Sequence, residues 1–204
     1  MAGVNAIDGS FTEAHYAFQG GREDIYSLIS MSCAILRRRR QLIAIAESMT
    51  GGMLANLWFN EPDVASVFAG ATITVGEKSL STLLDVPEVL LENFTIASGE
   101  VARAMVEGIG SRLGSHFSIG IVGVDSRYHS SASQPVGLVW VAFKTPTRLL
   151  VQRLDFSSYA YQRTLISERA CYAACKIFLQ ILFEEKVPEM PESHVDDFLP
   201  FGVV

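Results

Sequence analysis

Apolar residues recur along this chain with two kinds of spacing, one typical of helices and one typical of strands. The two alternate along the sequence, which predicts helices and strands in turn. Between 24 and 40 they fall at helical spacing, which predicts a first helix. An aliphatic run at 42–46 predicts a buried strand, and the pattern at 51–60 predicts a second helix that Pro62 closes. The chain therefore begins with a helix, a strand and a helix in sequence.

The rest of the chain continues this alternation. A β-branched, alternating stretch at 67–75 predicts a second strand. The elements predicted after it are short helices at 77–84 and 87–93, a long helix from a Ser98 cap to Gly114, strands at 117–124, 137–144 and 149–156, and a final helix at 161–185. The last two strands are close enough along the chain to pair antiparallel.

These elements predict an α/β fold, a three-layer αβα sandwich with a mixed, mostly parallel sheet of about five strands. We expect one domain over 23–186, preceded by an N-terminal tail or arm at 1–22. An acidic C-terminal tail is expected at 187–204. Its apolar residues Phe198, Leu199 and Phe201 are suited to docking on the core or on a partner.

Composition narrows the class of protein. The chain has 204 residues, is 49% hydrophobic and carries a net charge of -6, which argues against nucleic-acid and anionic-membrane partners. No stretch is long enough to span a bilayer, and we expect a cytoplasmic protein. Cys33, Cys171 and Cys175 supply too few ligands for a structural zinc site and are better interpreted as reduced core thiols. We expect neither a metal nor a cofactor.

The only basic run is Arg37 to Arg40. A nuclear localisation signal is one interpretation of such a run. Cations at the end of a helix also complement its dipole, and we favour that interpretation.

Candidate chemistry begins directly behind the first strand, in the segment Ala46-Glu47-Ser48-Met49-Thr50-Gly51-Gly52. A turn of this kind brings backbone amides to a helix N-terminus, where they favour negative charge. The amides of Thr50, Gly51 and Gly52 are therefore candidate donors to an oxyanion or phosphate beside the Ser48 hydroxyl. The alternative is that Ser48 or Thr50 only caps the helix and the glycines only permit close packing.

A second candidate loop follows the third strand. It comes after Gly123 and carries Asp125, Arg127 and His129. In open α/β sheets ligands bind beyond the carboxyl ends of the strands, so we expect this loop and the Ser48 turn to form one site.

From about 24 to 185 the order of these motifs resembles the CinA C-terminal domain, whose characterised members are nicotinamide mononucleotide amidohydrolases. The matching pieces are the Ser48 segment, Phe68-Ala69-Gly70-Ala71, Leu83-Leu84-Asp85-Val86-Pro87, Ser98 with Val101-Ala102-Arg103-Ala104-Met105, Gly123, and Pro135-Val136-Gly137-Leu138-Val139-Trp140. The resemblance implies a small-molecule or nucleotide substrate, Ser48 as the nucleophile that attacks a carboxamide, and a homodimer.

The chain departs from the family at two positions that the resemblance makes functional. A tyrosine and a lysine complete the family's catalytic group, and their positions fall on Val75 and Leu80. Lys78 is the nearest lysine, but an offset of two residues on a helix turns a side chain by about 200 degrees. A serine without a base is a poor nucleophile, so another base is needed.

Other side chains are candidates for the missing roles. A Ser48–His129–Asp125 relay would follow the logic of an activated serine, although His129 and Asp125 are also ordinary loop residues. Glu47 is a weaker candidate base, because a carboxylate at a strand end is more readily paired with an arginine. Arg163 lies near a family arginine that binds phosphate, and Tyr159 and Tyr161 beside it either stack on a base or simply pack.

Three functions are compatible with this sequence. The first is an amidohydrolase that acts on a nucleotide or other small carboxamide. The second is a catalytically inactive relative that binds a nucleotide or a protein partner. The third is a specialised enzyme with a different substrate, whose specificity the loop after Gly123 would set.

Overall fold

The computed structural model describes residues 22–125, 131 and 134–185 of the chain. The expected N-terminal arm, apart from its last residue, and the expected acidic tail lie outside this part. The helices and strands are α1 (Arg22–Arg39), β1 (Ile43–Glu47), α2 (Met53–Phe59), β2 (Phe68–Ile73), α3 (Glu77–Leu84), α4 (Glu88–Asn93), α5 (Gly99–Leu113), β3 (Phe117–Gly123), β4 (Leu138–Lys144), β5 (Leu149–Asp155) and α6 (Arg163–Glu184). Each of these elements was expected from the hydrophobic pattern, with ends that differ by two residues at most.

Within the described residues five strands form one sheet in the order β2-β1-β3-β4-β5. β1 pairs parallel with β2 and β3, whereas β4 pairs antiparallel with β3 and with β5. Four of the strands therefore run in one direction and only β4 runs against them, which confirms the mixed, mostly parallel sheet. The last residues of β1, β2, β3 and β5 all lie at the same end of the sheet, here called the carboxyl end.

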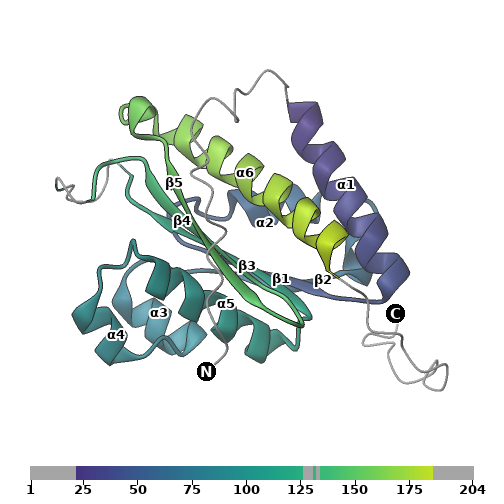
Figure 1. Ribbon diagram of the computed structural model, residues 1–204, viewed down its shortest axis with the longest axis horizontal. Helices are drawn as coiled ribbons and strands as arrows, with labels where there is room; N and C mark the ends of the chain where they lie inside the picture. The colour runs from purple at the N-terminus through teal and green to yellow at the C-terminus, as the bar shows by residue number, and fades with distance from the viewer. Residues whose placement is uncertain (1–21, 126–130, 132–133, 186–204) are drawn as a thin grey trace.

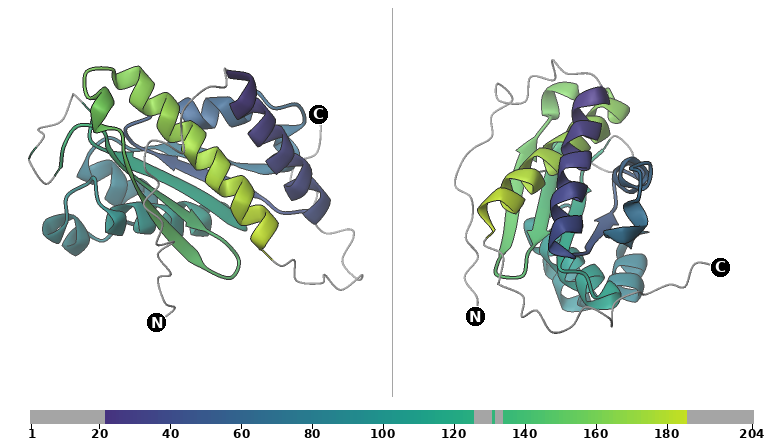
Figure 2. Two further views of the ribbon diagram at one scale, coloured as in Figure 1. Left: turned by 45° about the horizontal axis from the view of Figure 1, so that its top comes forward. Right: turned by 90° about the vertical axis from the view of Figure 1, so that its right-hand side faces the viewer.

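Helices cover both faces of this sheet, which confirms the three-layer sandwich. α1, α2 and α6 lie on one face, and α3, α4 and α5 lie on the other (Figures 1 and 2). Two large apolar clusters result, beside a small one of Ala97, Val124 and Leu138. The larger lies under α1, α2 and α6, and the smaller joins β1 to α3 and α5.

Two glycines allow α5 to approach its neighbours closely. A Cβ on Gly120 of β3 would lie 2.8 Å from a methyl group of Val106 on α5. On the other side of α5, a Cβ on Gly108 would lie 1.9 Å from the carbonyl oxygen of Leu84 at the end of α3. A side chain at either position would push these layers apart.

The basic run ends a helix, as expected. Arg37, Arg38 and Arg39 form the last turn of α1, where their charges complement the helix dipole. The Arg39 guanidinium also donates to the carbonyl oxygen of Leu182, 2.9 Å away in the last turn of α6. The run therefore joins the ends of α1 and α6, two of the three helices on this face of the sheet.

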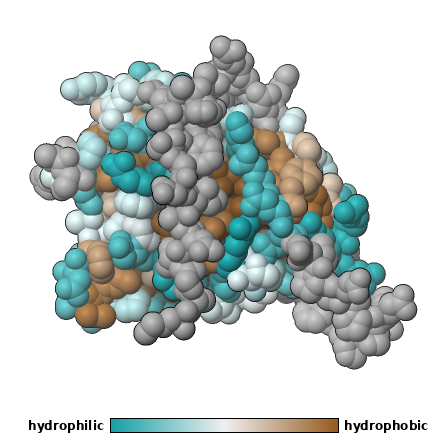
Figure 3. Space-filling model, viewed as in Figure 1, coloured by the Kyte–Doolittle hydropathy of each residue, from teal (hydrophilic) through white to brown (hydrophobic). Residues whose placement is uncertain are grey.

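None of the described helices is both long and apolar enough to cross a membrane. Apolar surface is nevertheless present. In the space-filling view it gathers at the lower left, where α4 lies (Figure 3), and Val89 and Phe94 are among the exposed apolar residues of this region.

We expect Gly108→Ala to destabilise the protein. The added methyl group meets a backbone carbonyl that cannot rotate away, and such overpacking costs about 1–3 kcal/mol. This outweighs the gain in helix propensity, which is at most about 1 kcal/mol. Denaturant unfolding of this variant measures the loss, with the exposed Ser111→Ala on the same helix as control. Equal midpoints for Gly108→Ala and wild type would contradict the close contact between α3 and α5.

We also expect the three thiols to be unreactive in the folded protein. Cys33, Cys171 and Cys175 are free and buried. Burial raises the pKa of Cys33 and of Cys175 to about 12, and burial together with the Glu47 charge raises the pKa of Cys171 as well. Because the thiolate is the reactive form, a disulfide reagent at neutral pH should titrate these thiols only after denaturant is added. Rapid labelling of the native protein would contradict this.

Candidate functional site

The structure brings the ends of three neighbouring strands together at the carboxyl end of the sheet. Ser48 follows β1, Thr74 follows β2, and Asp125 stands two residues beyond β3. Glu47, the last residue of β1, pairs in register with Ile73 on one side and Ile121 on the other. The Ser48 turn and the start of the loop after β3 therefore adjoin, as expected for a shared site.

Glu47 organises this region. Its side chain is fully buried, and its carboxylate accepts hydrogen bonds from the Thr50 hydroxyl at 2.6 Å and from the backbone amides of Gly52, Leu54 and Ala55 at 3.2, 3.1 and 2.7 Å. The prediction that Glu47 pairs with an arginine is wrong. The partial positive charge at the amino end of α2 compensates its carboxylate instead. Glu47 thus ties the end of β1 to the first turn of the next helix.

This carboxylate also decides the role of the surrounding turn. Gly52, at φ 94°, is the N-cap of α2, so the alternative in which Ser48 or Thr50 caps the helix is wrong. The Gly51 amide donates to the carbonyl oxygen of Ser48, and the Gly52 amide donates to Glu47. These two amides are consumed inside the turn, which contradicts their expected role as donors to an oxyanion or phosphate.

Ser48 differs from the other hydroxyl residues of the turn. Its backbone amide donates to the carbonyl oxygen of Ile121, 3.0 Å away on β3, and its side chain is nearly buried. The hydroxyls of Thr50 and Thr74 both donate to Glu47, to its carboxylate and to its backbone oxygen. By contrast, the Ser48 hydroxyl makes no hydrogen bond with any other described residue. It is held in place through its backbone alone.

The glycines at this end permit close packing. A Cβ on Gly52 would lie 2.7 Å from the Ile73 side chain. A Cβ on Gly123 would lie 2.6 Å from the Leu138 carbonyl oxygen and 2.7 Å from the Met49 sulfur. Of the two glycines in the turn, the packing interpretation therefore holds for Gly52 but not for Gly51, where an added Cβ would meet no atom within 4 Å. Gly123 and Met49 form a close contact that the sequence pattern did not suggest.

Asp125 is paired with Arg163. The Asp125 carboxylate is fully buried and accepts from the Arg163 Nε at 3.1 Å, while the arginine, the first residue of α6, keeps 44% of its side chain exposed. The loop after β3 is thereby joined to the start of the last helix. His129 and Arg127 lie outside the described residues, so the Ser48–His129–Asp125 relay stays a prediction.

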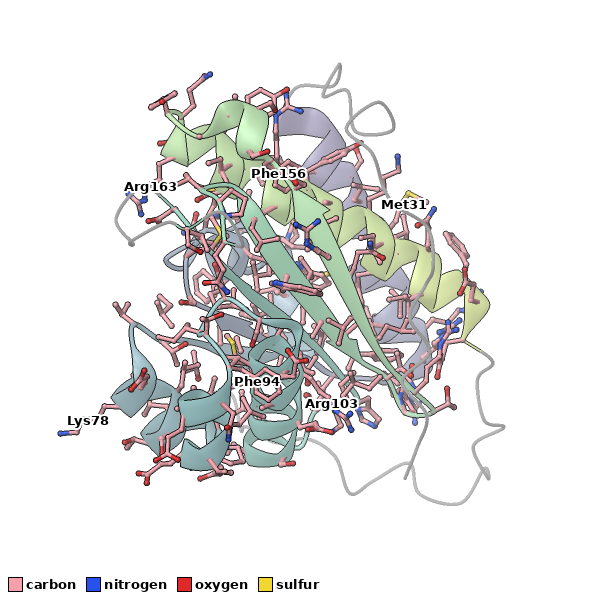
Figure 4. The ribbon with its side chains drawn as sticks, turned by 60° about the vertical axis from the view of Figure 1, so that its left-hand side comes forward. Met31, Lys78, Phe94, Arg103, Phe156 and Arg163 are labelled. Carbon is pink, nitrogen blue, oxygen red and sulfur yellow. The ribbon has the colours of Figure 1, made fainter. Side chains whose placement is uncertain are left out.

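The structure separates Lys78 from the place where the family lysine is expected. Leu80 is fully buried in the smaller apolar cluster, and Val75 is 67% exposed. Lys78 is exposed on α3 and projects away from the body of the protein, far from Arg163 (Figure 4). Its ammonium group therefore does not take the place of the family's catalytic lysine in this arrangement.

Residues near the start of α6 make contacts of their own. The Arg169 guanidinium lies over the Tyr159 ring, 4.1 Å from its centre, whereas Tyr161 is fully exposed. Hydrogen bonds from Ser157 hold the pKa of Asp155, at the end of β5, below its usual value. Of the two tyrosines, only Tyr161 presents its whole ring to solvent.

No group of three or more His, Cys, Asp or Glu among the described residues is suited to a metal ion.

Thr74 is a site residue that the sequence analysis missed. It is fully buried, and both its amide and its hydroxyl donate to the Glu47 carbonyl oxygen, at 2.7 and 3.2 Å. A threonine near the end of the strand predicted at 67–75 was the available signal, but only the pairing of β1 with β2 shows its partner.

We expect Glu47→Gln to lower the free energy of unfolding by about 3 kcal/mol. An amide has one acceptor oxygen instead of two and would turn its own N–H groups toward other donors, which leaves buried polar groups unpaired. The control is Glu107→Gln on α5, whose half-exposed carboxylate forms an ion pair with Arg103 and should change stability by less than about 0.5 kcal/mol. Denaturant unfolding compares the two, and equal midpoints would show that Glu47 does not anchor α2.

Known proteins share this architecture. The family model of the CinA C-terminal domain matches residues 8–182. A CinA-like protein from Desulfovibrio desulfuricans is 40% identical over 139 residues, which are 68% of this chain and 32% of that protein. A CinA-like protein from Parasynechococcus marenigrum is 39% identical over 120 residues, 59% of this chain and 29% of that protein. The chain thus spans about a third of the length of the curated relatives that it matches.

Solved structures agree with these sequence matches. A competence-damaged protein (CinA) superfamily protein from Escherichia coli superposes with a TM-score of 0.74 at 25% identity, covering 80% of this chain and 94% of that one. A CinA superfamily protein from Klebsiella pneumoniae superposes with a TM-score of 0.73 at 22% identity, covering 79% of this chain and 99% of that one. Sequence and fold lead to the same conclusion: the chain belongs to the CinA C-terminal domain family.

Proposed function

We propose that this chain is a CinA-family amide hydrolase that acts on a small carboxamide, with Ser48 as the nucleophile. The nicotinamide mononucleotide carboxamide is the first substrate to consider, because characterised relatives in the family deamidate it. Hydrolysis would release ammonia and leave the corresponding carboxylate.

The Ser48 hydroxyl is the observation that carries this proposal. The hydroxyls of the neighbouring residues Thr50 and Thr74 both donate hydrogen bonds to Glu47. Ser48 alone of the three has a hydroxyl that is not engaged with a described residue, while its backbone is fixed to β3. A nucleophile needs this combination of a positioned backbone and an oxygen free to attack.

The chemistry follows the usual course of serine acyl transfer. The Ser48 oxygen adds to the carboxamide carbon, and its proton passes to a base. The base returns that proton to the leaving nitrogen, ammonia departs, and water then cleaves the acyl-serine. His129 is the proposed base, since it lies four residues beyond Asp125, which is buried at the same end of the sheet.

A second candidate function is binding without hydrolysis. It is supported by Val75 and Leu80, which replace the family's tyrosine and lysine, and by the outward direction of Lys78 (Figure 4). In that case the turn would hold a nucleotide or a related carboxamide that is not consumed. A different substrate for the same serine, selected by the loop after Gly123, is the remaining variant of the first proposal.

An assay of ammonia release from nicotinamide mononucleotide tests the proposal. We expect turnover by the wild-type protein and a loss of at least about a thousandfold in Ser48→Ala, because the variant lacks the attacking oxygen. Ser32→Ala, which removes another buried serine hydroxyl on α1, is the control and should retain activity.

The other outcomes decide between the candidates. If wild type and Ser48→Ala are equally inactive but the nucleotide raises the melting temperature of both, the binding function is correct and hydrolysis of this substrate is excluded. If Ser48→Ala retains the activity of the wild type, Ser48 is not the nucleophile.

A further inference from the structure

Two arginines at the end of α1 have no side-chain partner in the described part of the protein. Arg38 and Arg40 are exposed, and neither forms an ion pair or side-chain hydrogen bond with another described residue. Arg37, by comparison, donates to the Ser66 hydroxyl and the Pro62 carbonyl oxygen. The charge of Arg38 contributes, after desolvation, to lowering the pKa of Arg39.

Arg40 also occupies an unusual backbone position. Its φ of 52° lies in the left-handed region that favours glycine. Its amide donates to the Arg37 carbonyl oxygen and the next amide, that of Gln41, donates to Leu36, which is the hydrogen bonding of a helix end that normally carries glycine. Asp85, at the end of α3, has the same left-handed conformation with φ 53°.

The nearby carboxylates of α6 do not neutralise these arginines. Glu184 pairs with Arg148 at 2.8 Å, and the buried Glu185 accepts from the hydroxyls of Thr145 and Thr147. Within the described residues, therefore, no carboxylate pairs with Arg38 or Arg40.

Carboxylates suited to pair with Arg38 and Arg40 follow in the chain directly after Glu185. Residues 186–204 follow Glu185 and contain Glu189, Glu192, Asp196 and Asp197. Lys186 is the only lysine or arginine among them, and they include one histidine, His194. Their point of departure is close to the arginines, because Arg39 bonds to Leu182 and also interacts electrostatically with Glu185. An extended chain covers about 13 Å in the four residues to Glu189, so the acidic segment can reach the end of α1.

We propose that the acidic segment 189–197 binds intramolecularly to Arg38 and Arg40, as a strap across the ends of α1 and α6. A short flexible tether holds the segment at an effective concentration in the millimolar range, which lets a few exposed ion pairs suffice. A net charge of -6 for the whole chain argues against nucleic acid as the occupant. This proposal is independent of the proposed hydrolysis.

Protection of the segment from cleavage tests the strap. A glutamate-specific protease at low salt cuts after Glu189 and Glu192, and mass spectrometry follows each bond in the full-length chain. We expect Arg38→Asp with Arg40→Asp to raise the cleavage rate about three- to tenfold, as expected for two lost exposed ion pairs. About 500 mM salt should accelerate cleavage of the wild type similarly, because it screens such pairs.

Matched variants separate binding from general destabilisation. Arg103→Asp makes the same charge change on α5, on the opposite face of the sheet, and should leave the rate unchanged. Adding Asp196→Arg and Asp197→Arg to the reversed arginines should restore slow cleavage.

Three results would overturn the proposal. The first is a rate that neither salt nor the reversed arginines change. The second is protection that disappears on dilution, which would assign the cluster to the acidic segment of a second copy. The third is faster cleavage that the reversed segment does not rescue, which would indicate loosening of the helix ends.

Discussion

The buried carboxylate of Glu47 is the interaction on which the carboxyl end of this sheet depends. A fully enclosed negative charge is tolerated only when its lone pairs are satisfied, and here three backbone amides and one hydroxyl do so. The carbonyl oxygen of the same residue receives both donors of Thr74. One residue thus connects β1, β2 and α2, and the Ser48 turn is confined between them.

This arrangement limits what the site can recognise. The amides at the start of α2 would attract an anion if they were free, but Glu47 already occupies that role. For the proposed function, a negatively charged part of the substrate would therefore not find the amides of Gly52, Leu54 and Ala55 available. Arg163 is the candidate for that role in the proposed function, since the buried Asp125 holds its Nε while 44% of the side chain stays exposed.

The opposite end of the sheet is organised by charge in a different way. There Glu185 and Glu184 hold the hairpin between β4 and β5 through Thr145, Thr147 and Arg148, and Arg39 joins α1 to the end of α6. Threonine hydroxyls and an arginine thus both pair with Glu184 and Glu185 at this end. The proposed site lies at the carboxyl end, whereas the contacts at the other end join the covering helices and the β4–β5 hairpin.

The sequence by itself determined the elements and their order, because side-chain periodicity is a local property of strands and helices. It also determined that Leu80 cannot act as the family lysine and that Lys78 is turned away from its position on α3. Tertiary structure alone decided the partners of Glu47 and Asp125. Their hydrogen bonds form across a turn or between residues 38 positions apart, and such contacts depend on how the sheet and helices pack in space.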